Sequence, residues 1–308
     1  MAAPTGTYDA PFGRMLTAMV TPFTSDGAVD YETARRLATY LVDEQRNDGL
    51  VVSGTTGESP TTTDEEKERL LRAVVEAVGD RATVVAGAGT NDTHHSVEVA
   101  RAAERAGAHG LLLVTPYYSK PPQEGIYRHF CTVADATALP AMLYDIPGRS
   151  GVPIQRETLT RLAGHERIVA VKDAKADLFE GSQVIASTGL AYYSGDDTLN
   201  LPWLSVGAVG CVSVIGHVAG AEIAAMIEAY RSGDAAGALA IHRRLLPVVS
   251  GIMMQAGGAI MAKAALNLVG QPAGPMRSPL VEATAEQLGR LREDLITGGV
   301  KLPDEVVT

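Results

Sequence analysis

Eight short apolar runs recur along the chain, each followed by a segment that suits a helix. The runs lie at residues 15–21, 49–53, 83–87, 110–115, 141–145, 168–172, 190–194 and 210–214. They are nearly continuous in apolar character, which is typical of strands buried on both faces of a parallel sheet. Segments 65–78 and 97–106 carry apolar residues at helical spacing, and Thr63 with Glu66 predicts a capping box at the first of them.

This alternation predicts an α/β fold, a (β/α)8 TIM barrel with a C-terminal helical extension. A doubly wound open sheet is the alternative, but no GxGxxG follows the first run and eight regular units suit a barrel better. The strand pattern stops after residue 214, and alanine-rich stretches at 221–230, 234–248 and 284–296 predict helices. We therefore expect a catalytic barrel over residues 1–232 and a helical domain over residues 233–308.

One uncharged stretch, residues 245–262, approaches the length of a membrane span. Pro247, Gly251, Gly257 and Gly258 interrupt it. We interpret it as a broken helical region buried in the protein.

Charge and cysteine content narrow the possible partners. The chain carries 26 Lys and Arg against 36 Asp and Glu, a formal net charge of −10, with no long basic run. Such a balance repels nucleic acid and anionic membranes, so we expect neither as a partner. Cys131 and Cys211 form no CxxC pair, and the N-terminus lacks a basic segment followed by an apolar one. A cytoplasmic location fits both features.

Lys172 is the sharpest candidate for chemistry, because active sites of such barrels lie at the carboxyl ends of the strands. It closes the sixth apolar run, where apolar walls disfavour the ammonium form and favour the neutral amine that attacks a keto group. Tyr144 lies in the fifth run, on the adjacent strand, and could move protons. Taken singly, Lys172 also reads as a lysine paired with Asp173, and Tyr144 as a core aromatic residue.

Two further features suit carboxylate ligands. Residues 54–59, with the sequence GTTGES, offer N–H groups and hydroxyls just before a predicted helix. Arg149, in a Pro-Gly-Arg-Ser-Gly loop, offers a guanidinium fork. A metal hydrolase is less well supported, because His94 and His95 are adjacent in sequence and His217 stands apart. Together the features favour carbon–carbon bond formation or cleavage at a keto acid.

Four motifs, in order and spacing, resemble those of the dihydrodipicolinate synthase family, and most of all its actinobacterial members. They are GTTGES at 54–59, TPYY at 115–118, YDIPGR at 144–149 and VKDA at 171–174. That family belongs to the pyruvate-dependent class I aldolases, with N-acetylneuraminate lyase. The resemblance covers the whole chain and implies condensation of pyruvate with L-aspartate 4-semialdehyde to 4-hydroxy-tetrahydrodipicolinate, the first committed step of diaminopimelate and lysine biosynthesis.

The resemblance also implies a role for individual residues. Lys172 would form the Schiff base with pyruvate. The proton relay would comprise Tyr144, Thr56 and Tyr118, the last reaching in from a neighbouring protomer. Four residues would bind the substrates: Thr55 and Thr56 the pyruvate carboxylate, Arg149 the semialdehyde carboxylate, and Val212 the pyruvate through its backbone. No metal or organic cofactor is implied, and a homotetramer built as a dimer of dimers is expected.

The chain departs from the family pattern where lysine binds as a feedback inhibitor. Ser59, Asn91 and Tyr117 match that pattern, whereas four residues depart from it: Pro60, Asp64, Lys67 and His95. His95 stands where a carboxylate receives the amine of the inhibitor, and an imidazole supplies no fixed negative charge. We therefore expect weak or absent inhibition by lysine.

Two other functions remain open at this stage. A sugar-acid lyase similar to N-acetylneuraminate lyase would share Lys172, but Arg149 suits a second substrate that carries a carboxylate. A catalytically silent relative that senses small molecules is the third possibility. Every position that the chemistry requires carries a suitable residue, which argues against a catalytically silent protein.

Overall fold

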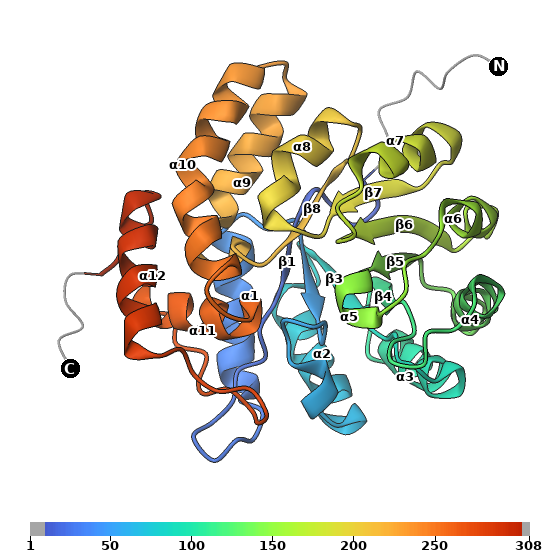
Figure 1. Cartoon of the computed structure of the whole chain (residues 1–308). Coiled ribbons are helices and arrows are strands. Elements are labelled where there is room, and N and C mark those ends of the chain that lie inside the picture. Colours follow the sequence, from blue (N-terminus) through green and yellow to red (C-terminus); the bar gives the residue numbers. More distant parts are fainter. Residues whose placement is uncertain (1–9, 304–308) are drawn as a thin grey trace.

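Eight parallel strands close into a barrel in the order of the sequence, with β8 paired to β1 (Figure 1). The computed structural model describes residues 10–303. Residues 1–9, which carry part of the expectation about export, and residues 304–308 lie outside the described residues. The strands are β1 (Met15–Ala18), β2 (Gly49–Val52), β3 (Thr83–Gly87), β4 (Gly110–Val114), β5 (Ala141–Asp145), β6 (Ile168–Asp173), β7 (Ala191–Ser194) and β8 (Gly210–Ser213).

Helices surround the barrel; those up to α8 connect successive strands, and α9 follows the last strand (Figure 1). They are α1 (Tyr31–Asp43), α2 (Asp64–Val78), α3 (Thr93–Arg105), α4 (Gln123–Asp135), α5 (Pro147–Ser150), α6 (Arg156–Leu162), α7 (Leu178–Ser187), α8 (Asn200–Ser205) and α9 (Gly216–Arg231). The predicted (β/α)8 barrel is confirmed, and so is the capping box of Thr63 and Glu66 at the start of α2.

The strands divide their side chains between two cores. Inward-facing residues of alternate strand positions, such as Leu16, Val51 and Met142, form one cluster inside the barrel. Their neighbours, such as Met15, Leu50 and Leu143, join the larger cluster between strands and helices. This period of two is the ordinary geometry of a strand, and it explains why both faces read as apolar in the sequence.

Element boundaries differ from the sequence prediction by a few residues, and polar contacts accompany two of the differences. The first strand ends at Ala18 rather than at residue 21, and Thr21 lies in the following loop, where its hydroxyl donates to the Gly57 carbonyl at 2.6 Å. Helix α3 begins at Thr93 rather than near residue 97, because the Asp92 side chain caps it by accepting from the His94 N–H. Both changes come from polar contacts that hydrophobic spacing does not reveal.

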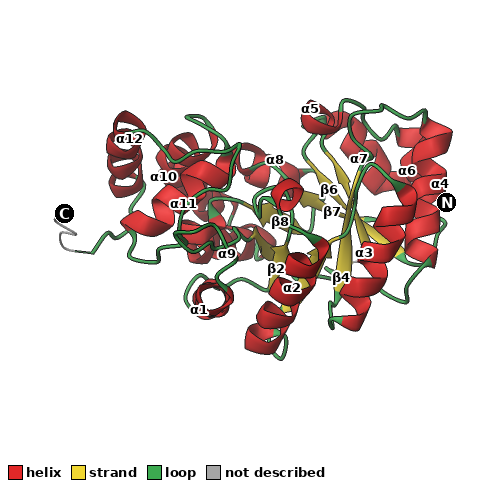
Figure 2. Cartoon of the chain, turned by 90° about the horizontal axis from the view of Figure 1, so that it is seen from below, coloured by secondary structure: helices red, strands yellow, loops and turns green. Residues whose placement is uncertain are grey.

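The C-terminal extension lies on one side of the barrel, next to α9 (Figures 1 and 2). It comprises α10 (Ala235–Met253), α11 (Gly258–Leu268) and α12 (Ala285–Thr297). The predicted break in the uncharged stretch falls between α10 and α11, which meet at 114°. Among the described residues no single helix is long and apolar enough to cross a membrane, and only this bent pair passes on length and composition.

Leu291 should anchor α12 to the rest of the extension. Its side chain is fully buried, whereas Leu288, one turn earlier, is 37% exposed. We expect Leu291→Ala to lower the free energy of unfolding by about 2–5 kcal/mol, because it leaves a cavity that its neighbours fill only partly. Leu288→Ala should cost under about 1 kcal/mol. Denaturant unfolding of both variants measures the difference, and equal losses would contradict this packing.

Candidate active site

Lys172 lies inside the barrel near the carboxyl end of β6. Its side chain is almost fully buried, and its register partners on the flanking strands are Tyr144 and Tyr193. The Lys172 Nζ lies 4.0 Å from the centroid of the Tyr144 ring. A Cβ at Gly195 would come within 3.0 Å of the Lys172 Cγ, so glycine there leaves room for the lysine side chain. Lys172 and Tyr144, both singled out in the sequence, are thus brought together inside the barrel.

The turn at residues 54–59 is tightly closed by its own backbone. The N–H groups of Gly57 and Ser59 donate to the Gly54 carbonyl, and the Glu58 N–H donates to the Thr55 carbonyl. Within residues 10–303, the N–H groups of Thr55 and Thr56 take part in no backbone hydrogen bond, so they remain available to an anion. Thr55 is exposed and Thr56 is buried.

Arg149 lies on the short helix α5, directly after β5, and its side chain is exposed. Hydrogen bonds hold the loop that carries Arg149: the Ser150 hydroxyl donates to the carbonyls of Ile146 at 3.0 Å and Val152 at 2.9 Å. Gly151 ends the helix with φ +81°, a left-handed conformation that favours glycine. The guanidinium therefore stands on a rigid loop at the barrel mouth.

A cavity of about 450 Å³ connects these parts. Its lining includes Thr55, Ser59, Pro60, Asp64, Lys67, Asn91, His95, Tyr117, Tyr144 and Arg149. The Tyr144 ring joins this cavity to Lys172, because it lines the cavity and also carries the Lys172 Nζ on its face. Lys172, Thr56 and Val212 are buried and do not line the cavity.

Tyr118 stands apart from the other candidates. It does not line the cavity, its side chain is 89% exposed, and its backbone has φ +73°. A non-glycine residue with positive φ is uncommon. In one chain, therefore, the Tyr118 hydroxyl lies outside the site that the other residues form.

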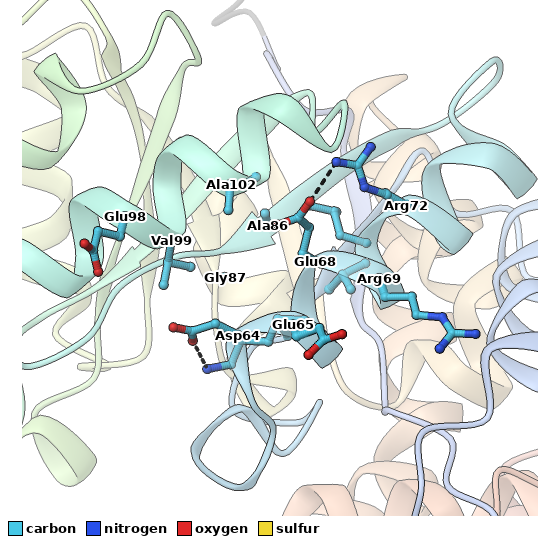
Figure 3. A pocket seen from close by; sticks show the side chains of 15 residues that line it. Asp64, Glu65, Glu68, Arg69, Arg72, Ala86, Gly87, Glu98, Val99 and Ala102 are labelled. Carbon is cyan, nitrogen blue, oxygen red and sulfur yellow. Dashed lines mark hydrogen bonds and ion pairs between the residues drawn. The ribbon is translucent and has the colours of Figure 1, made fainter.

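A groove between α2 and α3 adjoins this cavity (Figure 3). Val99 and Ala102 face it from α3, and the Glu68–Arg72 ion pair flanks it on α2. At the junction of groove and cavity the His95 Nε2 lies 2.7 Å from the Asp64 Oδ2, joining the two helices. The Lys67 Nζ lies 3.5 Å from the other oxygen of Asp64. The Asp64 carboxylate is thus already shared by two neighbours.

Next to Val212, a buried carboxylate to which the sequence analysis gave no structural role, that of Asp197, is hydrogen-bonded to the end of β8. Val212 lies in the inner cluster on β8, one residue before Ser213. The Asp197 Oδ1 accepts from the Ser213 hydroxyl at 2.6 Å, and its Oδ2 accepts from the N–H groups of Val214 and Ile215. Asp197 therefore fixes the carboxyl end of β8. Its place directly after the seventh strand was the available signal.

Among residues 10–303, no group of three or more His, Cys, Asp or Glu is placed to hold a metal ion. His94 lies beside Glu98, and His217 is fully buried. The His217 Nε2 accepts from the Val20 N–H, and its Nδ1 lies 2.7 Å from the Val214 carbonyl oxygen. Burial lowers the pKa of His217 to about 4. It therefore stays neutral and ties β8 to β1.

The sequence model of the Dihydrodipicolinate synthetase family matches residues 11–297. The chain belongs to this family. It is 68% identical over 290 residues to the 4-hydroxy-tetrahydrodipicolinate synthase of Acidothermus cellulolyticus, covering 94% of each chain. It is 65% identical over 300 residues to 4-hydroxy-tetrahydrodipicolinate synthase 2 of Streptomyces coelicolor, covering 97% of this chain and all of the relative.

A solved structure supports the same assignment. The crystal structure of DHDPS from Cyanidioschyzon merolae, which has lysine bound, superposes with a TM-score of 0.92 at 43% sequence identity. The match covers 95% of this chain and 100% of that one. The likeness therefore includes the C-terminal extension.

In this member of the dihydrodipicolinate synthetase family, two buried carboxyl groups lie at the carboxyl ends of β5 and β6. Asp145 follows Tyr144, Asp173 follows Lys172, and the two aspartates are register partners. Burial raises the pKa of Asp145 to about 7 and that of Asp173 to about 6. Burial alone would lower the pKa of Lys175, but Asp145 and Glu180 raise it above its usual value.

These raised pKa values make stability depend on pH. Because the unfolded Asp145 ionises near pH 4 and the folded one near pH 7, folding should weaken as pH rises through that window. Asp145→Asn keeps an acceptor for the Ile154 N–H, which now donates to the Asp145 Oδ1. Relative to the parent, this variant should gain stability on the order of 3 kcal/mol between pH 4 and pH 8.

Unfolding midpoints across that pH range measure this gain, with the exposed Asp80→Asn as the matched control. A constant difference between Asp145→Asn and the parent would show that Asp145 titrates normally in the folded state.

Proposed function

We propose that the protein condenses pyruvate with L-aspartate 4-semialdehyde to give 4-hydroxy-tetrahydrodipicolinate, a lyase reaction on the route to diaminopimelate and lysine. The observation that carries the proposal is the buried Lys172 amine on the face of Tyr144, next to a cavity with an anion-binding turn and Arg149. The relatives above, which bear the name of this synthase, support it.

The reaction begins with a Schiff base on Lys172. The neutral Nζ adds to the keto carbon of pyruvate, and the carbinolamine loses water to give the iminium ion. Loss of a proton from the methyl carbon then gives the enamine. Tyr144, whose ring contacts the Lys172 Nζ, is placed to exchange protons at this centre.

The enamine carbon attacks the aldehyde carbon of the semialdehyde, and the aldehyde oxygen takes a proton. The amino group of the semialdehyde then adds to the iminium carbon, which closes the ring and releases the Lys172 amine. Every covalent bond between substrate and enzyme is thus formed and broken at the Lys172 Nζ. No metal or organic cofactor enters this scheme.

Two anion sites orient the substrates. The unused N–H groups of Thr55 and Thr56 suit the pyruvate carboxylate, and the buried Thr56 hydroxyl is proposed to relay protons with Tyr144. Arg149 suits the carboxylate of the semialdehyde, because its fork stands on a rigid loop at the mouth. Val212 would contact pyruvate through its backbone. A carboxylate-bearing aldehyde is therefore favoured over the sugar of a lyase.

Tyr118 completes the proposed relay only from another protomer. Its 89% exposed side chain on a positive-φ residue supports a role at an interface rather than in its own site. We propose a homotetramer of two tight dimers, in which dimerisation is required for activity. A cytoplasmic location is proposed as well, supported by the free thiols of Cys131 and Cys211.

Turnover tests the function directly. Consumption of L-aspartate 4-semialdehyde should depend on pyruvate when the product is coupled to dipicolinate reductase and NADPH loss is followed. Lys172→Ala and Lys172→Arg should each lose roughly a thousandfold or more, because neither side chain forms the imine. Substantial turnover in either variant, or cleavage of a sugar acid by the parent at a higher rate, would refute the proposal.

Lysine should inhibit weakly or not at all. The Asp64 carboxylate is occupied by His95 and Lys67, and the Lys67 ammonium repels a second amine. Initial rates against lysine concentration measure the effect, and His95→Glu should increase sensitivity by restoring a carboxylate. Half-inhibition of the parent at sub-millimolar lysine would contradict the prediction.

A further inference from the structure

Glu58 and Lys263 form a buried ion pair between the 54–59 turn and the C-terminal extension. The Lys263 Nζ, on α11, donates to the Glu58 Oε1 at 2.7 Å, and the two side chains are 3% and 1% exposed. The same nitrogen donates to the Pro275 carbonyl at 2.7 Å and lies 4.4 Å from the centroid of the Phe23 ring. Its surroundings leave it little freedom.

The second oxygen of Glu58 is held as firmly as the first. The Arg277 N–H donates to the Glu58 Oε2 at 2.9 Å. The Arg277 guanidinium reaches Glu66 with both terminal nitrogens, and also the carbonyls of Gly27 and Thr61. The segment 273–277 together with Lys263, here called the C-terminal clamp, thus grips the turn and the start of α2.

The clamp also holds the loop after β1. The Phe23 N–H donates to the Ala273 carbonyl at 3.2 Å. A Cβ at Gly274, whose φ is +74°, would come within 1.7 Å of the Phe23 carbonyl oxygen. Only glycine permits this approach of two backbones. The first two loops at the barrel mouth are therefore both fixed by residues more than two hundred positions away in the sequence.

A contribution to folding stability does not by itself explain why Glu58 and Lys263 are buried as an ion pair. Two charges lose their hydration when buried, and well-packed apolar residues are often at least as stabilising. Burial lowers the pKa of Lys263 below its usual value even against the opposing effect of Glu58. Glu58 moreover takes a left-handed conformation, with φ 55° and ψ 36°. Strain of this kind persists where the surroundings fix the backbone, and it gathers at functional sites.

We infer that Glu58 and Lys263 are positioning residues that hold the N–H groups of Thr55 and Thr56 in the geometry that binds the keto-acid carboxylate. This inference rests on the proposed function for the identity of that ligand. Glu58 lies two residues after Thr56, and its N–H closes the turn on the Thr55 carbonyl. A shift of the Glu58 carboxylate therefore moves the anion site directly. The C-terminal extension thus helps to shape the active site, although it does not contact the substrate.

Lys263→Met tests the inference, because it removes the charge while keeping the shape of the stem. We expect the KM for pyruvate to rise roughly tenfold or more, with a much smaller change in kcat and in the KM for the semialdehyde. Lys263→Arg should recover most of the loss. A purely structural role would instead lower the amount of active enzyme and leave both KM values unchanged.

Arg244→Gln is the matched control, since it removes a cation whose partner, Glu222 on α9, also joins the extension to the barrel. It should leave the pyruvate KM unchanged. The Lys263→Met, Glu58→Gln double variant should bind pyruvate better than Lys263→Met alone, because no buried carboxylate is left without its lysine counter-charge. If the losses of pyruvate binding caused by the two single substitutions simply add in the double variant, the inferred coupling between Glu58 and Lys263 is wrong.

Hydrogen exchange separates this inference from the proposed function. The N–H groups of Gly57, Glu58, Ser59 and Thr61 donate hydrogen bonds within this turn, and they should exchange faster in Lys263→Met than in the parent, whatever ligand the site takes. Faster exchange with weaker pyruvate binding supports the inference. Faster exchange in Lys263→Met, combined with no pyruvate binding by the parent, upholds the positioning role and refutes only the identity of the ligand. Unchanged exchange, or unchanged pyruvate binding by a loosened turn, overturns the inference.

Discussion

The alternation of side chains along parallel strands is the constraint on which the rest of the structure depends. It sends every second residue into the barrel, so Tyr144 on β5 and Lys172 on β6 meet inside while Asp145 and Asp173 meet outside. The register between β5 and β6 thus creates two different environments on opposite faces of the same two strands. The inner one places an amine on an aromatic face, and the outer one buries two carboxyl groups beside Lys175.

In the proposed mechanism the barrel supplies the reacting groups and loops at its rim supply the anion sites, so the conformation of these loops must be held by other parts of the chain. That support comes from polar contacts over long sequence separations: Thr21 to Gly57, Asp197 to Val214, and Lys263 to Glu58. The first and third contacts are buried, and the second is partly buried. The catalytic geometry is therefore a property of the barrel and the extension together, and the family likeness over the full chain is consistent with this dependence.

Much of the fold and part of the site could be predicted from the sequence. Continuous apolar runs specify buried parallel strands, and residues at or near the ends of those runs, such as Lys172 and Tyr144, must lie near the barrel mouth. The role of Lys263 could not be predicted, because a lysine inside an apolar helix carries no sign of its distant partner. The outward orientation of Asp145 and Asp173 could have been predicted, because each directly follows an inward-facing residue of its strand.

The most direct test of the account is to locate the covalent bond to pyruvate. The protein is incubated with pyruvate and borohydride, digested, and the modified peptide is sequenced by mass spectrometry. The account predicts a reduced pyruvyl adduct on Lys172 alone, because its Nζ lies inside the barrel on the Tyr144 ring. No adduct, or an adduct on Lys175 or Lys263 in place of Lys172, would contradict it.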